Sequence, residues 1–132
     1  MSGREDDGRR PSRVTVEVDA SAEAVTIVIR GELDLVTLPV LAGQLARVSR
    51  DKPERLVFDL AGTSFMDCGS ARLIAGSGSW LRDGGRPVIR HPGPGVRRIL
   101  GLTGLDAYCD IEVLSGSGKN ERLGTRRAPR AE

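Results

Sequence analysis

Apolar and polar residues alternate along the first part of the chain in the manner of two strands. The run VTVEV (14–18) alternates strictly, and AVTIVIR (24–30) repeats the pattern after a short turn over residues 19–22. A period of two is typical of a strand with one buried and one exposed face. Because the connection is short, we expect the two strands to pair antiparallel. GELD (31–34) is expected to end the second strand.

The spacing of apolar residues then changes to that of helices. Three helices are predicted: one between Thr37 and Lys52, one over residues 68–82, and one over residues 96–102. Thr37 and Asp67 are N-cap candidates for the first two, and Pro39 suits a first turn. Gly104 is placed to cap the third helix at its C-terminal end.

Between the helices lie short, strongly apolar segments. RLVFDL (55–60) is nearly continuous, as in a buried parallel strand, and AGTSFMD (61–67) is expected to be a loop after it. RPVIR (86–90) and DIEVL (110–114) are the remaining strands. The order predicts a single α/β domain, with three to four helices packed on a mixed, mostly parallel sheet of about five strands.

Length and composition fit one domain with two polar ends. The chain has 132 residues, of which 39% are hydrophobic and only 3% aromatic, so the core must be built from aliphatic side chains. We expect a flexible arm over residues 1–12, the domain over 13–114 and a disordered basic tail over 115–132. No apolar run is long enough to span a membrane, and no secretory signal is expected. Two cysteines are too few for a disulfide framework and favour a reducing, cytoplasmic setting.

The charge of the chain says little about partners. The formal net charge is +2, and the tail over 115–132 carries five basic and two acidic residues. A basic tail can contact nucleic acid, but no aromatic residue interleaves the arginines here. We therefore expect a solvated end and no direct binding of nucleic acid.

Candidate chemistry is sparse. His91 is the only histidine, and Cys68 and Cys109 lie far apart in the sequence, so no metal site and no cofactor is predicted. The run from Cys68 to Arg72 is too short for the phosphate-cradling loop of a cysteine phosphatase, and no histidine stands near as a base. The sequence therefore does not predict an enzyme.

One stretch, FMDCGSARLI (65–74), remains open to two interpretations. Asp67 could simply cap a helix, with small residues in the turn. Alternatively, a serine at a helix N-terminus is expected to be exposed, and backbone amides there favour the negative charge of a phosphate. The residues alone do not decide between a turn and a phosphorylation switch.

Four segments together resemble STAS domains of the anti-sigma-factor antagonist type, in particular actinobacterial members. They are GELD (31–34), RLVFDLAGTSFMDCGSARLI (55–74), GRPVIRHPGPGVRRIL (85–100) and LTGLD (102–106). The resemblance covers about residues 13–114 and implies a free-standing bacterial protein. It implies binding to an anti-sigma factor, itself a serine kinase of the ATP-binding type, and so regulation of sigma-factor-dependent transcription in the cytoplasm.

The resemblance also implies a switch, and the motif departs from it. In the family, the kinase phosphorylates the second serine of an Asp-Ser-Ser-Gly-like motif and the phosphorylated antagonist lets go. Here Asp67 and Cys68 match the first two positions, Gly69 stands where the phosphorylated serine is expected, and Ser70 stands in the place of the glycine.

Three options follow from this inverted order. Ser70 is a displaced acceptor, or the protein binds its partner without phosphorylation, or it has become a scaffold for other partners. By resemblance, Glu32 and Asp34 lie beside the motif and help to form the docking face; their alternative role is to cap the first helix. A nucleotide or small-molecule sensor module is the alternative from another class. The sequence does not indicate an oligomeric state.

Overall fold

The computed structural model describes residues 14–21, 24–114 and 120–122 of the chain. Strands in this part form one sheet in sequence order, with antiparallel outer pairs and parallel inner pairs. The strands are β1 (Val14–Ala20), β2 (Ala24–Leu33), β3 (Arg55–Met66), β4 (Val88–Arg90), β5 (Asp110–Leu114) and β6 (Asn120–Arg122).

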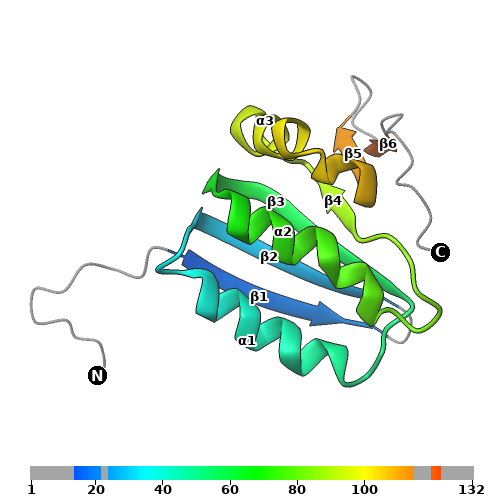
Figure 1. Cartoon of the computed structure of the whole chain (residues 1–132). Helices are drawn as coiled ribbons and strands as arrows, with labels where there is room; N and C mark the ends of the chain where they lie inside the picture. The colour runs from blue at the N-terminus through cyan, green and yellow to red at the C-terminus, as the bar shows by residue number, and fades with distance from the viewer. Residues whose placement is uncertain (1–13, 22–23, 115–119, 123–132) are drawn as a thin grey trace, which may run out of the picture.

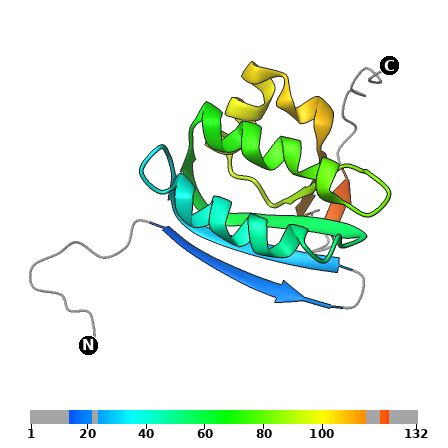
Figure 2. The ribbon, with the colours of Figure 1, turned by 60° about the horizontal axis from the view of Figure 1, so that its bottom comes forward.

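Three α-helices pack on one face of this sheet (Figures 1 and 2). They are α1 (Leu38–Ser49), α2 (Cys68–Gly76) and α3 (Pro94–Thr103), with 3-10 turns η1 (Ser77–Trp80) and η2 (Leu105–Tyr108). The predicted fold class is confirmed, as is Gly104, which ends α3 with a φ of 76°. In the described part of the chain, no helix has both the length and the hydropathy needed to cross a bilayer.

The core lies between the sheet and the helices. Alternate residues of the central strands point into it and are fully buried, among them Ile27, Ile29, Phe58 and Ile89. Each such side chain contributes roughly 1.5–3 kcal/mol when it leaves water. The core is almost entirely aliphatic, as the composition requires, with Phe58 as its one fully buried aromatic among the described residues.

Two strands continue beyond the points where we expected them to end. The GELD segment does not break β2, which runs to Leu33, and the expected loop over 61–67 is strand up to Met66. The two extensions pair with each other, through a register shift at Gly31, whose φ is 107°. The Thr63 hydroxyl also donates to the carbonyl of Ile29 at 2.9 Å. Long-range pairing stabilises both extensions, and local sequence patterns do not report it.

The second helix is shorter than the expected 68–82. The α-helix ends at Gly76, and residues 77–80 form the tighter turn η1. A Cβ atom at Gly78 would collide with the carbonyl oxygen of Gly85, so the chain packs there at a distance that only glycine allows.

A sixth strand lies within the segment that we expected to be a disordered tail. β6 pairs antiparallel with β5, Glu112 opposite Arg122, so the expectation is wrong for residues 120–122. The open edge of β5 offers backbone groups to any extended segment, and the sequence following it supplies one. The remainder of 115–132, and the predicted arm over 1–12, lie outside the described residues.

Candidate functional site

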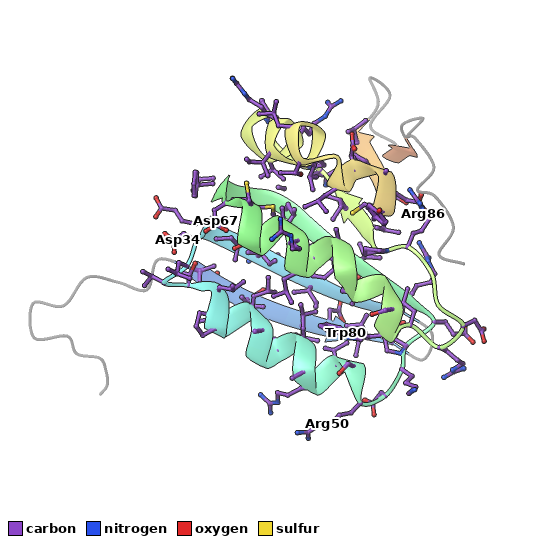
Figure 3. The ribbon with its side chains drawn as sticks, in the orientation of Figure 1. Asp34, Arg50, Asp67, Trp80 and Arg86 are labelled. Atoms are coloured by element: carbon purple, nitrogen blue, oxygen red, sulfur yellow. The ribbon has the colours of Figure 1, made fainter. Side chains whose placement is uncertain are left out.

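The motif and the GELD segment meet at one end of the sheet. Leu33 and Met66 are register partners at the ends of β2 and β3. Directly beyond them, the Asp67 amide donates to the Leu33 carbonyl at 3.0 Å. Figure 3 shows Asp34 and Asp67 at this same end of the molecule. The structure therefore brings together the two segments for which we predicted a joint surface.

Asp67 is the N-cap of α2, as predicted. Its Oδ1 atom accepts a hydrogen bond from the Ser70 amide at 2.8 Å, and its carbonyl accepts one from the amide of Ala71 at 3.0 Å. A side-chain cap of this kind satisfies an amide that the helix itself cannot pair. The Asp67 carboxylate thus fixes the backbone at the N-terminal end of α2, which is the part of the surface where we expect a partner to dock.

Asp34 shapes its own loop. Its Oδ1 atom accepts hydrogen bonds from the amides of Val36 at 3.0 Å and Thr37 at 3.1 Å. Thr37 is the N-cap residue, but its hydroxyl points back into the loop, accepting from the Asp34 amide and donating to the Glu32 carbonyl at 2.6 Å. Asp34 therefore stabilises the turn over residues 35–37; the two amides that it binds precede α1, whose N-cap is Thr37. Glu32 is half-buried beside Asp34.

Ser70 is not exposed, contrary to our expectation for a serine at this helix end. The residue is 0% exposed, and its hydroxyl has no hydrogen-bond partner within the described part of the chain. Gly69, one residue earlier, faces outward. A single step along a helix turns the side chain by about 100°, which carries position 70 from the surface into the core.

The outward stripe of α2 consists of small residues around one arginine. Gly69, Arg72 and Gly76 are exposed, and a Cβ atom at Gly76 would meet nothing within 4 Å. At Gly69 the nearest atom would be Asp67 Oδ1 at 3.8 Å. Tight packing applies to Gly78 and does not apply to Gly69 or Gly76.

Apolar side chains around the motif were missed at the sequence level. Leu35 is 80% exposed, and Val36, Val40 and Phe65 are also exposed. The sequence offered a sign of this exposure for Leu35 and Val36. Both are apolar, yet they precede the first helix and do not belong to its buried face. We define the motif surface as Leu35, Val36, Val40, Phe65, Cys68 and Gly69.

Other features of the described chain lie away from the motif surface. One surface hollow of about 440 Å³ is lined by Pro92, Pro94, Arg97 and Arg98, and neither it nor a second hollow near Tyr108 is lined by motif residues. Cys109 is fully buried, and burial raises the pKa of its thiol to about 12. Within residues 14–21, 24–114 and 120–122, no three His, Cys, Asp or Glu side chains are grouped as a metal site requires.

Comparison with known proteins gives a consistent picture. Residues 16–115 match the family model described as "Mlab, STAS domain". The anti-sigma-F factor antagonist RsfB of Mycobacterium tuberculosis is 28% identical over 96 residues, which cover 73% of this chain and 79% of RsfB. The crystal structure of an anti-sigma factor antagonist from Mycobacterium paratuberculosis has a TM-score of 0.68 at 28% identity, over 74% of this chain and 84% of that one. SpoIIAA in its unphosphorylated form has a TM-score of 0.65 over 78% of this chain and 90% of its own; at 21% identity, that likeness supports the fold alone.

Proposed function

The chain belongs to the STAS-domain family, and we propose that it is an anti-sigma-factor antagonist that binds its anti-sigma factor through the motif surface. RsfB and the Mycobacterium paratuberculosis protein, to which it is similar, bear that description. The partner in this proposal is an anti-sigma factor of the serine-kinase type, and the place of action is the cytoplasm. The proposal assigns binding to this protein and no chemical turnover.

The observation that carries the proposal is a set of exposed apolar side chains on the segments that adjoin the capped N-terminal end of α2. Leu35, Val36, Val40 and Phe65 are exposed on segments that adjoin the paired ends of β2 and β3, where Asp67 caps α2. Exposed apolar side chains that gather in one place mark interaction sites. Gly69 and Gly76 each cost the helix up to about 1 kcal/mol relative to alanine, and no contact within the described chain requires them. Close approach of a partner's backbone explains why glycine occupies both positions.

We further propose that the folded protein binds without phosphorylation. The acceptor position of the family motif is occupied by Gly69, which has no hydroxyl, and the displaced Ser70 is 0% exposed. A kinase must bring the hydroxyl into line with the γ-phosphate, and a buried hydroxyl is out of its reach. Of the three options left by the sequence, these observations favour constitutive binding over a displaced acceptor.

The binding proposal is tested with Gly69→Asp and the purified serine-kinase-type anti-sigma factor from the same genome. The aspartate places a charged side chain in the space reserved for the partner, and we expect at least a tenfold loss of affinity by calorimetry, or about 1.4 kcal/mol. Gly101→Asp is the matched control, since Gly101 on α3 also faces open space. Equal affinity of wild type and Gly69→Asp would remove the motif surface from the proposal.

Phosphorylation is tested separately by mass spectrometry after incubation with the same kinase and ATP. We expect no phosphate on the wild type and one on Gly69→Ser, because that substitution restores a hydroxyl at the exposed position. Phosphate on Ser70 of the wild-type protein contradicts constitutive binding without contradicting the docking surface.

A further inference from the structure

The outward side of α2 carries one charged residue among small ones. Arg72 is exposed, and α2 lies between α1 and α3 in the helix layer (Figures 1 and 2). The helix positions nearest to Arg72 are those three and four residues before and after it, and they hold Cys68, Gly69, Ala75 and Gly76. None of the four has a side chain larger than that of cysteine, so no long side chain of α2 adjoins the guanidinium.

Arg72 also lacks a counter-ion in its own chain. Among residues 14–21, 24–114 and 120–122, nothing forms an ion pair or a side-chain hydrogen bond with it. Several other arginines in this part of the chain each contact a carboxylate at 3.1 to 3.4 Å: Arg30, Arg82, Arg86 and Arg90. The Arg72 guanidinium is therefore available to an anion of another molecule.

Gly69 and Gly76 flank Arg72 on the same stripe of the helix. Seven residues separate the two glycines, which is two helical turns or about 10 Å along the axis. Neither glycine is required by a contact within the described chain, and the proposed function places the partner's backbone against both. At Gly76 the surface opens into a hollow of about 380 Å³ that Ser79 and Tyr108 also line, so this end of the stripe is accessible. A partner segment that contacts both glycines has to pass over Arg72.

Contact at both glycines removes water from around the guanidinium between them. A charged group is tolerated away from water only where it is paired and hydrogen-bonded. Arginine stays protonated in proteins, so Arg72 does not escape this cost by losing its proton. The partner therefore has to present an anion at this point, unless the side chain swings out of the contact and keeps its water.

We propose that Arg72 determines which partner is recognised, by pairing with the carboxylate of an aspartate or glutamate on the anti-sigma factor. This inference rests on the proposed function and adds the chemistry of the partner: an acidic side chain on a segment whose backbone approaches α2 on both sides of Arg72. A guanidinium and a carboxylate match in two parallel hydrogen bonds, so arginine selects this group by geometry as well as by charge. The small residues around Arg72 leave the guanidinium free to turn toward it.

Affinity for the purified serine-kinase-type anti-sigma factor tests the pairing, by calorimetry on variants shown to be folded by urea denaturation. We expect Arg72→Ala to bind about thirtyfold more weakly or worse, because it leaves the partner's carboxylate buried without a counter-ion, and Arg72→Glu to lose more. Arg72→Lys keeps the charge without the two-pronged geometry and should fall between wild type and Arg72→Ala. Arg55→Glu is the matched control: it makes the same charge change at an exposed residue where β3 begins, at the opposite end of that strand from the motif surface, and should stay within twofold.

Charge reversal on the partner identifies the group that Arg72 binds. We expect one aspartate or glutamate of the anti-sigma factor whose change to arginine restores binding of Arg72→Glu and does not restore binding of Gly69→Asp. The calorimetry is repeated without nucleotide and with ADP, since a phosphate is the other anion that a kinase can present. A loss in Arg72→Ala that appears only with ADP assigns the contact to a phosphate and overturns the carboxylate.

Failure of this inference and failure of the proposed function give different results. If Gly69→Asp loses affinity while Arg72→Ala and Arg72→Glu bind as tightly as wild type, the arginine remains in water; the inference is then wrong and the docking surface stands. If neither Gly69→Asp nor the Arg72 variants change the affinity, both are wrong. An equal loss in Arg55→Glu shows that the net charge of the chain governs the affinity, which also overturns a specific contact at Arg72.

Discussion

The two ends of the α2–η1 segment use glycine for opposite reasons. At the start, Gly69 faces open space, and beyond its chain neighbours and the backbone of its own helix an added Cβ would come no closer than 3.8 Å to any atom. At the far end, Gly78 lies against the carbonyl of Gly85, where no further atom fits. One end is held tightly by the protein's own backbone, and the other is left free. The comparison shows that a glycine in a helix has to be interpreted by its surroundings, because the residue type alone does not separate an anchor from an opening.

Gly78→Ala places a methyl group at the tightly packed end of the segment, and it should have the largest effect on stability. The methyl group collides with a backbone carbonyl that has no rotamer to escape into, so we expect a loss of about 3 kcal/mol in the free energy of unfolding, measured by urea denaturation. Gly76→Ala is the control: it meets nothing within 4 Å and should gain up to about 1 kcal/mol from helix propensity. Similar stabilities for the two variants would contradict the comparison.

Ser70→Ala tests the packing of the buried side of α2, directly behind Gly69. Removal of a buried hydroxyl without a partner should stabilise the protein by about 1–2 kcal/mol, measured in the same way. Because position 70 does not face the partner, affinity for the anti-sigma factor should stay within twofold. A destabilised Ser70→Ala would indicate that the hydroxyl is hydrogen-bonded after all.

Asp67→Ala examines the cap of the open end. Loss of the bond to the Ser70 amide should cost about 1 kcal/mol of stability. Asp67→Asn keeps an acceptor in the same place and should recover most of that loss, which separates capping from charge. If the asparagine variant is as unstable as the alanine variant, the charge matters more than the hydrogen bond.

The two cysteines also differ between an exposed and a buried site, and this difference predicts a pH dependence of stability. Its effect on stability is the smallest of those considered. Cys68 is exposed at the open end, while burial raises the pKa of Cys109 from 9.0 to about 12. Well below pH 9 the Cys109 thiol is neutral in both states; as pH approaches and passes 9, the unfolded chain loses this proton first, so stability falls as pH rises toward 12. We expect a loss of a few tenths of a kcal/mol between pH 8 and pH 9. Cys109→Ala should lack this component when its unfolding is compared with wild type over the same range.

Much of the fold could be predicted from the sequence because it depends on local periodicity. The alternation over 14–18 and 24–30 and the helical spacing after Thr37 gave the elements in the right order. The ends of β2 and β3 could not be predicted, since Gly31 to Leu33 and Gly62 to Met66 are held by each other across the sheet. The strand β6 was missed for the same reason: residues 120–122 resemble a polar tail until β5 is beside them.

The sequence predicted how the backbone of the candidate site is arranged. It did not predict which side chains are exposed there. Asp67 as a cap follows from a residue preference, and that prediction is confirmed. The burial of Ser70 depends on which side of α2 meets the sheet, and a shift of one residue at the helix start reverses the answer. Leu35 and Phe65 could have been noticed as apolar residues outside the buried pattern, but their gathering at one corner depends on the pairing of β2 with β3.

The hydrogen bond from the Asp67 amide to the Leu33 carbonyl has a consequence for how a partner is received. It joins the last residue of one strand to the cap of the helix that follows the next strand, while Asp34 closes the loop between them and α1. The acidic loop and the glycine-lined helix end are therefore a single stiff body before anything binds. Association then loses little conformational freedom on this side, and the free energy of contact is retained as affinity.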